Sequence, residues 1–193
     1  MAKMVKRYAL LIVDMQNDLV MPGSPLRVVG AKATVPVILK AMTAFRNRKL
    51  PIFHTVREYR PDGSDVEITK LTSFIEQTKG LVPGTKGCEI VGELRPLPGE
   101  YKIIKNRFSA FMNTELDFML RRLEINHIVV CGTQYPSCIR TTVFDGISYG
   151  YHVTVLTDAT SAKSQEIADA NINDMRDVGV ECVETAEFLK KLK

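Results

Sequence analysis

Three side chains capable of chemistry, Asp14, Lys105 and Cys138, each come just after a short apolar run of the sequence. If these runs are parallel strands, their carboxyl ends meet at one edge of a sheet, where α/β proteins bind their ligands. A thiolate there could attack a carbonyl carbon, and a carboxylate could take up the thiol proton and return it to a leaving amine. The three residues therefore predict a site for nucleophilic acyl transfer without histidine.

The setting of Cys138 favours a reactive thiol. It follows the loop 132–137 and lies at the start of a helical pattern, where unpaired backbone N–H groups would favour the thiolate. A neighbouring ammonium from Lys105 would lower the thiol pKa further. Taken singly, the residues also fit structural roles, with Cys138 as a buried small side chain, Asp14 as a turn cap and Lys105 as a solvated cation. Their joint placement at one sheet edge favours the catalytic interpretation.

The segments around these residues alternate between strand and helix patterns. Strands are expected over 8–14, 51–56, 101–104, 127–131, 152–156 and 180–183. Helices are expected over 34–48, 65–78, 113–123, 137–149, 165–178 and 185–192. This alternation predicts an α/β fold in which helices cover both faces of a parallel sheet. The irregular stretch 58–100 is rich in Pro, Gly and charge, and we expect it to form a lid or pocket wall.

Length and composition are those of one ordinary globular domain over residues 1–193, with 45% hydrophobic and 25% charged residues. The formal net charge is +4, but Lys and Arg are scattered along the chain, which favours solvated faces over a nucleic-acid surface. No apolar run reaches the ~18 residues of a membrane span. We therefore expect a small-molecule enzyme that binds neither nucleic acid nor membrane.

The four cysteines show no CxxC pair and no zinc-type spacing to histidine. Since a chain of this size needs no disulfide staples, free thiols in a reducing compartment are the simplest interpretation. The sequence also begins with residues that lead directly into an apolar strand rather than into a signal-peptide pattern. A cytoplasmic location is therefore expected.

Three motifs in the chain, 11–18 (LIVDMQND), 105–111 (KNRFSAF) and 131–142 (CGTQYPSCIRTT), follow one another in a familiar order. They resemble the opening motif, lysine segment and nucleophile elbow of the isochorismatase-like cysteine hydrolases. That family includes nicotinamidases, N-carbamoylsarcosine amidohydrolases and ureidoacrylate amidohydrolases. The resemblance covers nearly the whole chain and implies a Rossmann-like three-layer α/β/α sandwich with a six-stranded parallel sheet.

The resemblance also implies a role for each reactive residue. Asp14 would be the general acid and base, Lys105 would hold the thiolate and orient Asp14, and Cys138 would be the nucleophile. The oxyanion would be held by the backbone N–H groups of Gln134 and Cys138, with a cis peptide bond between Thr133 and Gln134. Relatives of this kind generally form dimers or larger homo-oligomers, which we expect here too.

Departures from the family pattern bear on the metal site. Nicotinamidases carry an Asp and two His after the second strand, whereas the segment 55–67 of this chain contains no histidine. His54, His127 and His152 fall on predicted strands without ligand spacing, so structural roles are expected for them. The sequence therefore predicts neither a metal site nor a cofactor. Tyr135-Pro136 stands where many relatives have Thr-Asp, which predicts a different pocket shape.

Several other side chains are candidates for binding the substrate. A planar guanidinium suits a carboxylate or ureido oxygen, and aromatic rings could line a small pocket. The arginines at 107 and 140 could instead bind backbone carbonyls or Asp side chains, and the phenylalanine at 111 could instead be core. The candidates are Gln16, Arg57, Arg107, Phe111, Tyr135 and Arg140.

The function that these features predict is hydrolysis of a C–N bond in a small amide, carbamoyl or ureido compound, through a thioester on Cys138. One alternative is the isochorismatase-type hydrolysis of a vinyl ether, which relatives perform by an acid route that leaves a thiol unused. The other alternative is a catalytically silent protein that binds a metabolite or a protein partner. Retention of Asp14, Lys105 and Cys138 favours the hydrolase.

Overall fold

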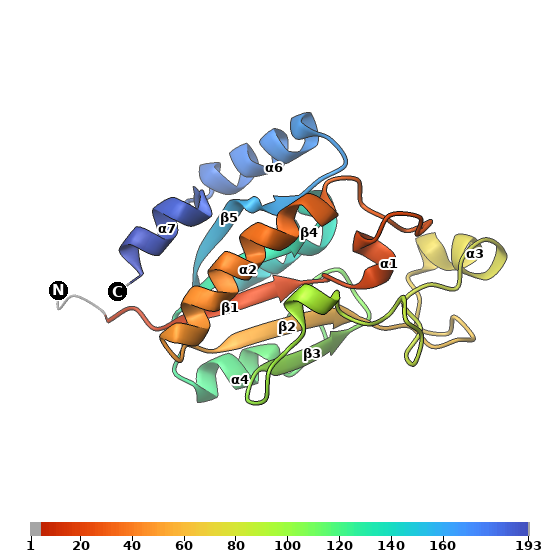
Figure 1. Cartoon of the computed structure of the whole chain (residues 1–193), viewed down its shortest axis with the longest axis horizontal. Helices are drawn as coiled ribbons and strands as arrows, with labels where there is room; N and C mark the ends of the chain where they lie inside the picture. Colours follow the sequence, from red (N-terminus) through yellow and green to blue (C-terminus); the bar gives the residue numbers. More distant parts are fainter. Residues whose placement is uncertain (1–4, 193) are drawn as a thin grey trace.

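Six parallel strands form the sheet at the centre of the computed structural model, which describes residues 5–192 (Figure 1). The strands are β1 (Tyr8–Val13), β2 (Ile52–Arg57), β3 (Tyr101–Lys105), β4 (His127–Thr133), β5 (His152–Ser161) and β6 (Glu181–Val183). Their order across the sheet is β3-β2-β1-β4-β5-β6, with every neighbouring pair parallel. The chain therefore has the six-stranded parallel sheet that the sequence predicts.

Helices cover both faces of this sheet and complete the predicted α/β/α sandwich. The helices are α1 (Asn17–Val20), α2 (Ala31–Asn47), α3 (Ile68–Glu76), the short 3-10 helix η1 (Gly92–Leu94), α4 (Leu116–Arg122), the π-helical turn η2 (Tyr135–Ile139), α5 (Arg140–Ser148), α6 (Gln165–Asp177) and α7 (Thr185–Lys191). Among the helices of residues 5–192, none combines the length and apolar character that crossing a bilayer requires.

Burial on both faces explains why the strands read as continuous apolar runs rather than as alternating ones. In β1, Leu10 and Ile12 belong to the hydrophobic cluster that includes α2 and α7, whereas Leu11 and Val13 belong to the cluster that includes α4, α5 and α6. All four side chains are buried, and each contributes roughly 1.5–3 kcal/mol to folding. Figure 1 shows α2 lying across the first of these faces.

Some boundaries differ from those expected. Helix α2 begins at residue 31 rather than 34, because the buried Ala31 also packs against the sheet. Strand β5 extends to residue 161 because its ladder with β4 shifts register after Val130 and then continues. The short α1 was not predicted, since four residues carry no helical period. The stretch 58–100 forms only α3 and η1, as its composition indicates.

The carboxyl ends of β1 and β2 point toward one side of the molecule, where Figure 1 shows α1 and α3 beyond the arrowheads. Strand β4 approaches β1 very closely at this edge. Gly132 has φ +117, and a Cβ built on it would lie 2.2 Å from the carbonyl oxygen of Val13. Only glycine allows this approach, which brings the segment after β4 against the end of β1.

Replacing Gly132 with Ala should therefore destabilise the fold, because the new methyl group collides with backbone that cannot move aside. We expect a loss of about 3 kcal/mol in the free energy of unfolding, measured by urea denaturation. Gly84→Ala is the matched control, since Gly84 also has a positive φ of +83 but nothing within 4 Å of its added Cβ. That variant should lose only about 1 kcal/mol. Equal losses would contradict the steric explanation.

Candidate active site

A buried ion pair joins the ends of β1 and β3. Lys105 Nζ donates a hydrogen bond to Asp14 Oδ2 at 2.8 Å, and both side chains are fully buried. Lys105 Nζ also donates to the carbonyl oxygen of Arg107 at 3.2 Å. Asp14 Oδ1, by contrast, accepts no hydrogen bond from any residue that the structure describes. One oxygen of Asp14 is therefore held by the ammonium while the other can accept a proton.

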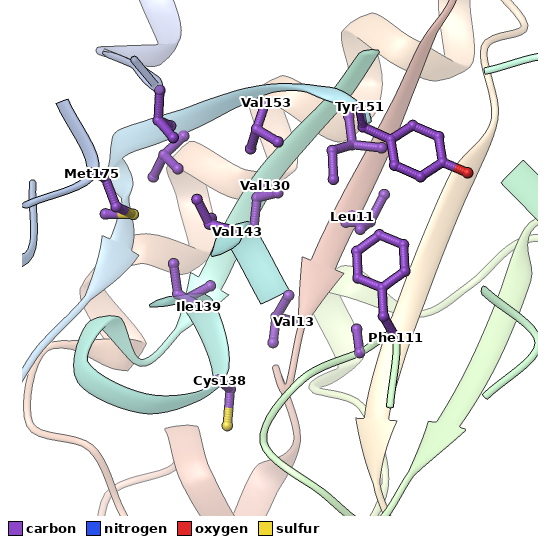
Figure 2. Close-up of a cluster of buried hydrophobic side chains, with 14 of the residues drawn as sticks. Leu11, Val13, Phe111, Val130, Cys138, Ile139, Val143, Tyr151, Val153 and Met175 are labelled. Atoms are coloured by element: carbon purple, nitrogen blue, oxygen red, sulfur yellow. The ribbon is translucent and has the colours of Figure 1, made fainter. Parts of the chain in front are cut away.

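Cys138 lies in the π-helical turn η2, between the end of β4 and the start of α5. The peptide bond between Thr133 and Gln134 at the entrance to this turn is cis, as the resemblance predicts. The cysteine is buried, with 6% of its surface exposed. Figure 2 shows it at the margin of a hydrophobic cluster, with its sulfur pointing away from Val13 and Ile139. The cluster thus fixes the main chain while the sulfur faces outward from the core.

Arg57, the last residue of β2, contacts this sulfur. Its Nη2 lies 3.1 Å from Cys138 Sγ, and its Nε lies 4.0 Å from Asp14 Oδ2. The guanidinium is buried and lies over the ring of Phe108, 4.9 Å from the ring centroid. The strand ends thus bring together two cations, one carboxylate and one thiol.

A cavity of about 280 Å³ opens onto these groups. Asp14, Arg57, Gln134 and Cys138 line it on the side of the sheet, and apolar side chains, among them Phe74 of α3, line other parts. A larger, open cleft lies beside the ends of β5 and α6, but it includes none of the three predicted catalytic residues. The smaller cavity has the apolar walls and few convergent polar groups that small-molecule sites share.

The electrostatic surroundings of Cys138 differ from those expected. Burial raises the pKa of the Cys138 thiol above its ordinary value, and the charge of Asp14 raises it further, whereas Lys105 and Arg57 lower it. The expected lowering of the thiol pKa by the ammonium of Lys105 is therefore outweighed, because the thiol is buried and lies near the charge of Asp14. Asp14, the carboxylate that contributes to this shift, lines the same cavity as Cys138.

Gln16 is a candidate that the structure does not bring into the cavity. Its Oε1 accepts from the backbone N–H of Arg57 at 2.8 Å, and its Nε2 donates to the carbonyl oxygens of Arg57 and Cys88 at 2.8 and 2.9 Å. The amide is buried and committed to main-chain groups. Gln16 thus holds the end of β2, and with it Arg57, in place.

Arg107 and Arg140 bind protein groups rather than facing the cavity. Their partners are backbone carbonyls and an Asp side chain, which is the alternative to substrate binding that the sequence left open. Arg107 Nη1 donates to the carbonyl oxygens of Asp65 and Asn106 at 2.6 and 2.7 Å. Arg140 pairs with Asp174 on α6 and lies over a neighbouring phenylalanine ring. Neither guanidinium lines the cavity beside Cys138.

The two aromatic candidates also lie outside the cavity. Phe111 is buried against Tyr149 and Tyr151, with ring centroids 5.2 and 5.9 Å apart. Tyr135 is fully buried in the core, where its hydroxyl donates to the carbonyl oxygen of Thr157 at 3.3 Å. Both therefore stabilise the framework around η2. Whether each ring points toward the cavity or toward the core could not be predicted from the sequence, because neither segment has a periodic pattern.

The histidines take part in structural contacts. His54 Nε2 lies 2.9 Å from a carboxylate oxygen of Glu100, and His127 Nε2 lies 2.8 Å from Thr154 Oγ1. Burial lowers the pKa of His127 to about 4. Within residues 5–192, no three side chains of His, Cys, Asp or Glu gather as metal ligands would.

Sequence reasoning did not find the contact between Arg57 and the sulfur, nor the residues that hold Arg57. Tyr59 Oη and Glu67 Oε1 accept from Arg57 Nη1 at 2.7 and 2.9 Å. The only available signal was a strand-end arginine followed ten positions later by a glutamate. Residues of α3 that line the cavity, such as Lys70 and Phe74, carried no signal of their own.

Comparisons with known proteins agree with this architecture. The family model described as the isochorismatase domain matches residues 8–187. A protein of Arabidopsis thaliana named "probable inactive nicotinamidase" is 38% identical over 195 residues, covering 100% of both chains. The ureidoacrylate amidohydrolase RutB of Pantoea ananatis is 31% identical over 178 residues, covering 83% of this chain and 71% of its own. The crystal structure of an isochorismatase family protein from Desulfovibrio vulgaris Hildenborough is 46% identical, with a TM-score of 0.94 and coverage of 97% and 99%.

Replacing Lys105 with Met should destabilise the fold, because it leaves the carboxylate of Asp14 buried without its ammonium. We expect a loss of about 3–5 kcal/mol in the free energy of unfolding, measured with urea. Lys102→Met is the matched control on the same strand, since Lys102 pairs with Glu58 at 2.6 Å but is half-exposed. That variant should lose less than about 1 kcal/mol. Similar losses in both proteins would show that the buried pair stabilises the fold no more than the half-exposed pair does.

Replacing Asp14 with Asn should lower the apparent pKa of Cys138, because it removes the negative charge that raises that pKa. The pH dependence of alkylation by iodoacetamide, followed at Cys138 by mass spectrometry, measures this shift. Half-alkylation should move to lower pH in the variant, and the exposed Asp62→Asn should leave it unchanged. A shift to higher pH would mean that Asp14 does not act on the sulfur through its charge.

Proposed function

Since the chain belongs to the isochorismatase family, we propose that it hydrolyses a C–N bond of a small amide, carbamoyl or ureido compound, with Cys138 as nucleophile. One observation carries the proposal: Asp14, held by Lys105, lines the same cavity as Cys138. An acid–base group beside a nucleophile is the requirement for this chemistry. The cavity of about 280 Å³ suits a small substrate.

The first step of the proposed reaction moves the thiol proton to Asp14 Oδ1 as the sulfur bonds to the substrate carbonyl carbon. The electron pair of the carbonyl π bond moves onto oxygen, and the backbone N–H groups of Gln134 and Cys138 are the proposed donors to this oxyanion. One such donor is worth about 3–4 kcal/mol in a comparable site. Lys105 stays charged throughout and keeps Asp14 oriented.

Collapse of this intermediate breaks the C–N bond, and the leaving amine takes the proton from Asp14. A thioester on Cys138 remains. Asp14 then takes a proton from water, which attacks the thioester carbon, and the thiolate leaves and regains its proton. The acid and the base of both steps are thus the same carboxylate, as the presence of a single carboxyl group among the described residues that line the cavity suggests.

Two alternatives remain distinct from this proposal. Vinyl-ether hydrolysis would proceed by an acid route and leave the thiol of Cys138 without a role. Binding without turnover is favoured by the name of the Arabidopsis relative, "probable inactive nicotinamidase". Retention of Asp14, Lys105 and Cys138 in this chain supports turnover. A homo-oligomer also belongs to the proposal, on the family resemblance alone. A cytoplasmic location belongs to it too, on the expected free thiols and the opening residues of the sequence.

Release of ammonia from nicotinamide, ureidoacrylate, biuret and N-carbamoyl amino acids tests the reaction class. Cys138→Ala should lower turnover of the accepted substrate by at least about 10³-fold while the circular dichroism spectrum stays unchanged. Cys182→Ala is the matched control, because that cysteine is also buried but lies on β6, outside the cavity. It should keep turnover close to that of the natural chain.

Undiminished ammonia release by the Cys138→Ala protein would exclude the thioester route. If none of these compounds released ammonia but one of them raised the melting temperature, binding without turnover would be the better conclusion. Formation of a thioester adduct at Cys138, seen by mass spectrometry after acid quenching, would support the proposed intermediate directly.

A further inference from the structure

The guanidinium of Arg57 is placed against both acidic members of the site. Its Nη2 lies 3.1 Å from Cys138 Sγ and its Nε lies 4.0 Å from Asp14 Oδ2. Only 3% of the residue is exposed, so water does not screen this charge. A cation in contact with a nucleophilic sulfur stabilises the thiolate relative to the thiol.

Hydrogen bonds hold this guanidinium in one orientation. Nη1 donates to Tyr59 Oη at 2.7 Å and to Glu67 Oε1 at 2.9 Å, and Nη2 donates to the carbonyl oxygen of Arg107 at 3.2 Å as well as to the sulfur. The hydroxyl of Tyr59 in turn donates to Glu67. All four Nη hydrogens therefore have acceptors within the protein. Only the Nε–H, which lies 4.0 Å from Asp14 Oδ2, has no hydrogen-bond acceptor among the described residues.

The two cations of the site thus contact different groups. Lys105 is hydrogen-bonded to Asp14, whereas Arg57 contacts the sulfur and lies only at the limit of an ion pair with Asp14. When the thiol proton passes to Asp14, the negative charge that remains is on the sulfur. The group beside that charge is the guanidinium of Arg57, which stays protonated under all conditions of protein chemistry.

We infer that Arg57 is a catalytic residue of the proposed hydrolysis, whose guanidinium stabilises the negative charge on the Cys138 sulfur. The inference rests on the proposed function. In acylation the S–H bond breaks, its proton goes to Asp14 and its electron pair forms the S–C bond, so the charge leaves the sulfur. In deacylation the S–C bond breaks and the electron pair returns to the sulfur. Arg57 therefore favours formation of the nucleophile and departure of the same sulfur as leaving group.

The contact also links the cavity wall to the sulfur. Glu67 directly precedes α3, and Thr69, Lys70, Ser73 and Phe74 of that helix line the cavity. The Arg57–Glu67 ion pair, with Nη1 and Oε1 2.9 Å apart, is one connection between this helix and the nucleophile, and the packing of Phe74 on Tyr59 is another.

Alkylation of Cys138 as a function of pH tests the inference without any substrate. The charges that face the sulfur are those of Asp14, Lys105 and Arg57, with Lys70 on the wall formed by α3. Arg57→Gln removes one cation, so alkylation at pH 7 should slow at least about tenfold and half-alkylation should move to higher pH. Arg57→Lys should recover part of the rate. The exposed Arg60→Gln is the control and should change neither.

An unchanged alkylation profile in folded Arg57→Gln protein would overturn the inference. Should that variant not fold, the side-chain ¹⁵N resonance of Arg57 in the natural chain decides, because a contact with the sulfur requires it to shift as Cys138 ionises. The shift should be absent in Cys138→Ala, and no shift in the natural chain would overturn the inference. Neither readout uses turnover, so the two proposals can be rejected independently. The role of Arg57 can be wrong while the proposed hydrolysis is correct, and the ammonia screen can be negative while Arg57 does contact the thiolate.

Discussion

The buried contact between Asp14 and Lys105 is the interaction on which the rest of the site depends. It joins the ends of β1 and β3, which are not neighbours, across the end of β2 that carries Arg57. Two charges with no access to water are tolerated only beside one another, so the pair requires three strands in the correct register. Cys138 follows β4, the next strand across the sheet. Four neighbouring strands, in the spatial order β3-β2-β1-β4, thus each contribute one charged or nucleophilic group.

Alternating apolar and helical patterns predicted all six strands and the layered architecture, because strands buried on both faces leave unbroken apolar runs that helices must separate. The boundaries were less predictable where tertiary contacts decide them. Strand β5 runs to Ser161 because β4 offers it a partner beyond the register shift, and α2 begins early because Ala31 packs on the sheet. Neither effect has a local signature in the residues concerned.

The positions of Asp14, Lys105 and Cys138 were predictable because a residue just beyond a strand end lies at the sheet edge whatever the loops do. The orientation of Arg57 was not, since it depends on Glu67 and on a loop with no periodic pattern. Gln16 likewise faces main-chain groups supplied by a segment more than 70 residues away, at Cys88. Tyr135 was a candidate for lining the pocket but is fully buried in the core, because the π-helical turn that contains it directs its side chain inward.

Strand β3, which carries Lys105, is the outermost strand on its side of the sheet and pairs with β2 alone among the described strands. Marginal strands open locally at a smaller free-energy cost than the whole domain does. Opening of β3 withdraws the ammonium from Asp14 and exposes Ile103, while β1, β4 and the rest of the two hydrophobic clusters stay in place. The proposed site would therefore be lost before the whole domain unfolds. The range of temperature or denaturant in which it persists would depend on the edge of the sheet rather than on the core.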